Sequence, residues 1–223
     1  MTTLNIKNQL NNALKQHHDG NVDAADKIYL QILKHDKYNF DANHLHGLVL
    51  SQKKEFSKSI NFYREAFLAN SKNVDLLNNY SISLRNIRNF KKCEDLLKSA
   101  INHDPLYLKS YLNLSNCFED QEKYEEAIDV IKKGRIIAPE SLDFNKKEIN
   151  CSVKIYISKR KNDRVGLVIF AGESFTQCPL TTDHNVLINL FKDVKSGMVE
   201  DGTATVSYTH LRAHETEADL VCR

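Results

Sequence analysis

The sequence predicts a mainly α-helical solenoid, an array of stacked helix pairs, and the main observation behind this is a repeat of 34 residues. Small side chains recur at this interval in two columns, one of Ala25, Ser59, Cys93 and Ala127 and one of Ala13, Gly47, Ser81 and Ser115. A constant interval of this length is typical of solenoids. The composition agrees, because the 223 residues include no Trp, only 7 Gly and only 3 Pro, which favours helix over turn-rich β structure.

Residues 6–139 divide into four units of helix, turn and helix that start near residues 6, 40, 74 and 108. In the third unit, apolar or small residues at three- and four-residue steps mark the two helices: Leu77, Tyr80, Ser81 and Leu84, then Phe90, Cys93, Leu97 and Ala100. Pro105 ends this unit, since proline lacks an N–H and its ring clashes with a preceding helical turn. We expect five side chains to be buried between the helix layers: Phe90, Leu97, Tyr111, Leu114 and Tyr124.

These columns resemble the tetratricopeptide repeat family over residues 6–139. The resemblance implies a right-handed α-solenoid, assigned here to residues 1–144, whose concave face binds a partner protein or peptide. The first two units depart from the family pattern and should be looser. Gln9 and Asn43 replace a large apolar residue there, and Lys37 and Ser71 stand where proline is usual.

Composition excludes several classes of protein. A net charge of +2 gives no strong attraction to nucleic acid or to a membrane surface. The longest apolar run, near 165–171, is too short to span a bilayer, and the N-terminus carries no signal-peptide pattern. The 5 Cys include no CxxC pair, which argues against a zinc site and a disulfide framework. We therefore expect a cytoplasmic protein without cofactors.

After residue 144 the repeat fails, and residues 145–153 are expected to be a junction. An apolar run over 164–171 and a segment over 174–180 predict two strands joined at Gly172 and Glu173. Asp183 is expected to cap a helix over about 185–194.

Residues from about 153 to 204 resemble the middle of a von Willebrand factor A domain of the aerotolerance (Bat) type. The resemblance implies a truncated, incomplete α/β fragment over 154–204, from a doubly wound fold that holds a divalent metal through an Asp-x-Ser-x-Ser motif, a Thr and a later Asp. Only Thr203 has a counterpart in this chain. One neutral hydroxyl is a poor site for a hard cation, which needs about six oxygen ligands, so we expect no metal site.

The last residues, about 205–223, resemble the translation of a transposon-based sequencing adapter, which matches Val206 to Thr216 letter for letter. We therefore expect a disordered tail of artefactual origin. The junction near 145–154 is then also expected to be an assembly artefact, which would make the chain a metagenomic chimera.

Four asparagines are candidate peptide-binding residues: Asn11, Asn79 and Asn113 in one column, interrupted by Leu45, and Asn116 one helical step beyond. The tetratricopeptide resemblance implies this role, because arrays that precede glycosyltransferase domains carry an asparagine column on their inner surface. An amide side chain can both donate to and accept from a peptide backbone. The alternative is that asparagine is simply frequent in this chain.

Two other sets of side chains are interpreted as structural and not as functional sites. His17–His18 and His44-x-His46 could indicate metal binding, but adjacent positions on a helix point about 100° apart, so surface positions or packing between helices are favoured. Cys93 and Cys117 fall in small-residue columns and are interpreted as inert buried thiols.

The sequence thus favours a non-catalytic scaffold that binds a protein or peptide. Two alternatives stay open. One is the recognition arm of a glycosyltransferase whose catalytic domain is missing, and the other is a fragment of a metal-dependent adhesion-type von Willebrand factor A protein.

Overall fold

The computed structural model describes residues 3–160, 163–171, 173–193 and 205–211. The chain divides into two compact units, Met1–Phe144 and Asn145–Arg223. None of the helices in the described residues is long and apolar enough to cross a membrane.

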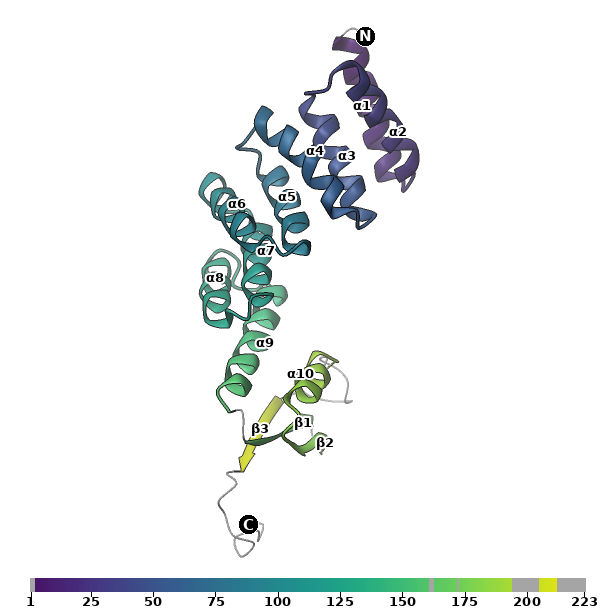
Figure 1. Ribbon diagram of the computed structural model, residues 1–223. Helices are drawn as coiled ribbons and strands as arrows, with labels where there is room; N and C mark the ends of the chain where they lie inside the picture. The colour runs from purple at the N-terminus through teal and green to yellow at the C-terminus, as the bar shows by residue number, and fades with distance from the viewer. Residues whose placement is uncertain (1–2, 161–162, 172, 194–204, 212–223) are drawn as a thin grey trace, which may run out of the picture. The chain divides into compact units, whose positions relative to one another are not determined.

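The first unit consists of successive helix pairs, which follow one another from α1 to α8 in Figure 1. The pairs are α1 (Thr3–His18) with α2 (Val22–His35), α3 (Phe40–Gln52) with α4 (Phe56–Ala69), α5 (Val74–Asn86) with α6 (Phe90–His103), and α7 (Leu108–Glu119) with α8 (Tyr124–Ile137). The second helix of each pair also packs on the first helix of the next. The predicted solenoid of repeated helix pairs is therefore confirmed.

The small-residue columns lie where helices cross. Ala25, Ser59 and Ala127 are fully buried, and Ser81 and Ser115 are buried equally in the other column. At Gly47 of α3, an added Cβ would lie only 2.8 Å from ring atoms of Tyr63 in α4. A larger side chain at such a crossing would hold the two helices apart.

The turn inside each pair carries one residue in the left-handed region at the same interval. Gly20 has φ 84°, Lys54 has φ 62°, and Arg88 and Glu122 both have φ 60°. This conformation commonly ends a helix, and only glycine adopts it without steric cost. The register of the turns is thus kept even where the residue is not glycine.

The expected core is mostly confirmed. Leu97, Tyr111 and Leu114 are buried, but Phe90 and Tyr124 are only half-buried, which corrects the prediction for both. Each is the first residue of its helix, so no preceding turn of that helix covers its ring.

Asn43, which departs from the family pattern, makes the same kind of contact as the residue in its column in the fourth unit. Its Nδ2 donates to the carbonyl oxygen of Lys37 at 2.9 Å, and the Tyr111 hydroxyl donates to the carbonyl oxygen of Pro105 at 3.0 Å. The polar replacement therefore ties α3 to the turn before it, as Tyr111 does for α7.

Residues 145–153, expected to be a junction, lie within a continuous helix, α9 (Leu142–Ser158). The repeat ends here, but the pattern still favours a helix. In the first unit, Phe144 is fully buried and fills the space left by Gly134, where a Cβ would lie 2.4 Å from its ring. In the second unit, Val153 and Ile157 lie one turn apart and are buried with other apolar residues of that unit.

The second unit contains a small antiparallel sheet in the order β2-β1-β3, with β1 (Arg164–Ala171), β2 (Glu173–Thr181), α10 (His184–Asp193) and β3 (Thr205–Leu211). Ile169 of β1 pairs with Phe175 on one side and Val206 on the other. The Asp183 carboxylate accepts from the backbone N–H groups of Asn185 and Val186 and so caps α10. The two strands and the helix follow the sequence prediction, whereas Gly172 lies outside the described residues.

One expectation for this unit needs correction, and the resemblance to a von Willebrand factor A domain is not confirmed. Residues 205–211 were expected to be disordered, but they form β3, because β1 offers a second edge of backbone N–H and C=O groups and the stretch Thr205–Leu211 is rich in β-branched and aromatic residues. The described strands are all antiparallel neighbours, so they do not show the doubly wound sheet of a von Willebrand factor A domain.

Replacing Tyr111 with Ala should lower the free energy of unfolding by about 3 kcal/mol or more, because the ring leaves a void and its bond to Pro105 is lost. Urea unfolding followed by circular dichroism measures this. Leu106→Ala is the matched control, since Leu106 is 72% exposed, and it should change stability by no more than about 0.5 kcal/mol. Equal effects of the two substitutions would show that the register of the fourth unit is wrong.

Candidate functional site

The first helices of the second, third and fourth pairs line one groove with a volume of about 650 Å³. Its lining residues are His44 and Leu48 of α3, Asp75, Asn78, Asn79 and Ile82 of α5, Tyr107 at the start of α7, and Lys109, Leu112, Asn113 and Asn116 of α7. Each of these helices presents residues at three- and four-residue steps, which places them on one helical face. The groove therefore crosses three repeats.

Three of the four predicted asparagines lie in this groove. Asn79, Asn113 and Asn116 are half-buried lining residues. Asn11 is exposed on α1 and is not among the lining residues, because the groove begins at α3. The column is thus divided where Leu45 interrupts it.

Asn113 is held by a hydrogen bond to Asn78, a groove residue that the sequence analysis missed. The Asn113 Nδ2 donates to the Asn78 Oδ1 at 2.9 Å. Asn78 is 3% exposed, and its own Nδ2 donates to the Ser110 hydroxyl at 2.8 Å and to the Val74 carbonyl oxygen at 2.9 Å. Asn78 therefore joins α5 to α7 through an amide whose nitrogen and oxygen are both hydrogen-bonded.

Asn79 is held in a similar way by His44, whose Nε2 lies 3.0 Å from the Asn79 Nδ2. His44 is 9% exposed, and its ring packs against Tyr63 with centroids 6.1 Å apart. Burial lowers the pKa of His44, although the carboxylates of Asp75 and Asp41 act in the opposite direction. The neutral imidazole is therefore the form favoured in this groove near neutral pH.

The rest of the groove combines apolar and charged groups. Leu48 and Ile82 add half-buried apolar surface. The Tyr107 hydroxyl donates to the Asp75 carboxylate, and burial together with this contact raises the pKa of Tyr107 to about 12. Lys109 is an exposed cation on the same lining. The groove thus offers amides, apolar surface and charges of both signs, but no arrangement of nucleophile and base.

The histidines outside the groove support the packing interpretation. His46 is 5% exposed, its Nδ1 lies 2.5 Å from the Asp26 carboxylate, and its ring meets Phe62 edge to face. His17 contacts Gln52 through its Nε2 at 3.2 Å. Within the part of the chain that the structure describes, no three metal-ligating side chains are grouped. Thr203, the counterpart of a metal ligand, lies outside that part.

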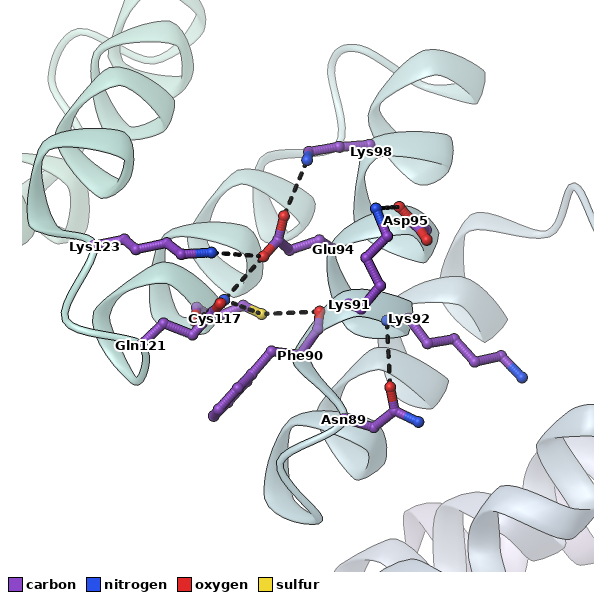
Figure 2. Close-up of polar contacts among 10 residues, drawn as sticks. All are labelled: Asn89, Phe90, Lys91, Lys92, Glu94, Asp95, Lys98, Cys117, Gln121 and Lys123. Atoms are coloured by element: carbon purple, nitrogen blue, oxygen red, sulfur yellow. Dashed lines mark hydrogen bonds and ion pairs between the residues drawn. The ribbon is translucent and has the colours of Figure 1, made fainter.

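A second polar cluster, shown in Figure 2, lies around Glu94 of α6. Its carboxylate contacts Lys98 at 3.1 Å and Lys123 at 3.5 Å, and it accepts from the Gln121 Nε2 at 2.9 Å. Burial raises the pKa of Glu94, but the hydrogen bonds from Gln121 and Lys98 outweigh burial and lower it overall. The cluster clamps α6 to the turn between α7 and α8.

Two buried thiols lie beside this cluster. Cys117 contacts the Phe90 carbonyl oxygen at 3.8 Å, as Figure 2 shows. A hydrogen bond with Cys117, together with burial, raises the pKa of Cys93. Since the thiolate is the reactive form, Cys93 is unsuited to nucleophilic chemistry.

Comparison with known families finds repeats of a known type in two segments of the chain. The tetratricopeptide repeat model matches residues 40–73 and 108–134, which contain the second helix pair and most of the fourth. Among curated proteins, no sequence matches this chain. The family match therefore covers the second and fourth helix pairs and leaves the rest of the chain unmatched.

Solved structures share the fold. The crystal structure of MamA protein is 15% identical, with a TM-score of 0.62 over 70% of this chain and 85% of that one. MamA from Desulfovibrio magneticus is 14% identical, with a TM-score of 0.62 over 68% and 85%. A tetratricopeptide repeat protein from Parabacteroides merdae is 14% identical, with a TM-score of 0.61 over 71% and 65%. At such low identity these likenesses show the fold alone.

His44 should make stability depend on pH. Because its folded-state pKa lies below the usual 6.5, the folded protein binds fewer protons there than the unfolded chain. Its contribution is complete above 6.5 and declines as pH falls from 6.5 toward the lowered folded-state pKa. Urea unfolding between about pH 7 and pH 5 should show a shallower decline for His44→Gln than for the wild type. His18→Gln is the control, since His18 is 93% exposed, and an identical slope in all three proteins would contradict the assignment.

Proposed function

We propose that this protein binds an extended segment of a partner protein in the groove lined by α3, α5 and α7. The observation that carries the proposal is that Asn79, Asn113 and Asn116 line the same groove across two adjacent repeats. Asn79 and Asn113 stand one repeat apart, so an extended chain could meet the two amides in succession. Tetratricopeptide arrays use such surfaces for protein binding, and the helical-repeat fold shared with MamA agrees with an interaction scaffold.

The chemistry of the groove favours a backbone-directed mode of binding. Amide side chains match the N–H and C=O groups of a peptide without demanding a particular ligand side chain. Leu48 and Ile82 offer apolar contact beside them, while Asp75 and Lys109 balance in charge. Weak binding to many sequences is the expected behaviour, since each net hydrogen bond contributes about 1 kcal/mol.

Combining Asn79→Ala with Asn113→Ala should weaken peptide binding about tenfold or more, because two hydrogen-bonding groups are lost. The full chain is used to select peptides from a displayed random library, and the affinity of the best peptide is measured by fluorescence anisotropy for both proteins. Helix content should remain the same, because both side chains face the groove and not the core.

The matched control combines Asn61→Ala with Asn102→Ala. Both asparagines are exposed on second helices of pairs, α4 and α6, so this variant removes two amides outside the groove. Its affinity should equal that of the wild type. Equal binding by the groove variant and the wild type would refute the assignment of the groove.

We also propose that residues 205–223 are a translated adapter and that two unrelated fragments are joined near residues 145–154. The support is the letter-for-letter match over Val206 to Thr216. Strand pairing of 205–211 is compatible with this origin, because backbone hydrogen bonds do not require selected side chains. Sequencing reads should break at codons 140–160 and 204–206, and continuous coverage by independent reads would contradict the proposal.

A further inference from the structure

Two buried polar side chains of the groove lining, His44 and Asn78, contact the half-buried asparagines Asn79 and Asn113. We call these two residues the second row. The orientation of the Asn78 amide follows directly from its hydrogen bonds. Its Nδ2 donates to the Val74 carbonyl oxygen at 2.9 Å, and a carbonyl oxygen can only accept. This contact fixes which end of the Asn78 amide is nitrogen. The Asn78 Oδ1 must therefore be the acceptor toward Asn113, and the Asn113 Nδ2 must be the donor.

The Asn79 amide lies with its nitrogen toward the ring of His44, although no carbonyl oxygen fixes this orientation as Val74 does for Asn78. An amide nitrogen cannot accept a hydrogen bond, so the contact of 3.0 Å between the Asn79 Nδ2 and the His44 Nε2 requires an unprotonated Nε2. The titratable groups around His44 are Asp41 on its own helix, Asp75 on α5 and Tyr63 on α4. Burial of the ring outweighs the two carboxylates and favours the neutral imidazole, of which the tautomer with its hydrogen on Nδ1 accepts at Nε2.

The amides of Asn79 and Asn113 consequently direct their nitrogens inward. Each amide carries two N–H groups and uses one of them on the second row. Among the described residues neither Oδ1 has a hydrogen-bond partner, although both side chains line the groove. The groove therefore presents two oriented acceptors, one repeat apart, on side chains that are already held in place.

We propose that His44 and Asn78 are positioning residues that hold Asn79 and Asn113 with their carbonyl oxygens toward the ligand, so that the ligand is an extended segment offering backbone N–H groups to both. This inference rests on the proposed function. Fixing the two amides in advance reduces the entropy lost on binding. It also excludes a class of partner, because a proline-rich segment has few N–H groups to offer.

The ligand class is tested with the peptide that the full chain selects from the random library. Each backbone N–H of that peptide is replaced in turn by an ester oxygen. At the position facing Asn113, the ester should weaken binding to the wild type about fivefold. The same ester should not change the affinity of the peptide for Asn113→Ala. An ester scan without any weakened position, or one identical in wild type and Asn113→Ala, would overturn the assignment. A polyproline peptide of equal length should not bind.

The positioning role is tested by Asn78→Ala and by pH. Although Asn78 is buried, its removal should reduce the ester effect at the position facing Asn113, since that amide is free to turn. Protonation of His44 places a hydrogen on Nε2, so the Asn79 amide must turn and present N–H groups instead of its oxygen. Peptide affinity should therefore fall as pH is lowered, and His44→Gln, which cannot titrate, should remove this fall. An identical pH profile in both proteins would overturn the role of His44.

A measurement without peptide separates this inference from the proposed function. In the wild type, the Nδ2 protons of Asn113 should exchange with solvent more slowly than those of the exposed Asn61, and Asn78→Ala should remove the difference. Exchange of Asn113 as fast as that of Asn61 would overturn the positioning role even if peptides bind. Failure of the full chain to select any peptide would overturn the proposed function and, with it, the ligand class.

Discussion

Close approach of helices at small residues is the constraint on which the rest of the first unit depends. At Gly47 even a methyl group would collide with the Tyr63 ring, and Ser59, Ser81 and Ser115 are completely buried. Small residues let the two helices of a pair approach closely. Each pair then buries its apolar stripe against the neighbouring pairs, and the array extends by repetition. The groove follows from the same spacing, since it sets α3, α5 and α7 side by side at the distance that lets Asn113 reach Asn78.

Sequence was sufficient to predict the helix pairs, because the interval of 34 residues and the apolar stripes follow directly from the backbone geometry of packed helices. It could not predict the left-handed turn residues Lys54, Arg88 and Glu122, since none of these residue types favours that conformation. It also missed that residues 145–153 continue as a helix, because the signal there is apolar spacing without the repeat. The pairing of 205–211 with β1 depends on a long-range edge that no local pattern reveals.

The candidate site shows the same division between local and long-range information. The candidate asparagines were visible in the sequence, and three of the four line the groove. The second row was not visible, because equivalent positions of successive repeats carry different residue types, His44 and Asn78. Their role depends on hydrogen bonds across 35 residues of sequence. A search for polar residues directly before the groove asparagines would have found Asn78, which precedes Asn79. The equivalent position of the preceding repeat would have given His44.

The central claim is that the partner segment lies in the groove of α3, α5 and α7, and its most direct test is chemical-shift mapping by NMR with the selected peptide. The account predicts that the side-chain amides of Asn79, Asn113 and Asn116 shift most on titration. A second hollow, of about 430 Å³ between α6, α7 and α8, includes Lys98, Asn102 and Val130 and serves as the internal comparison. Shifts concentrated at Asn102 and Val130, with the groove amides unchanged, would contradict the account.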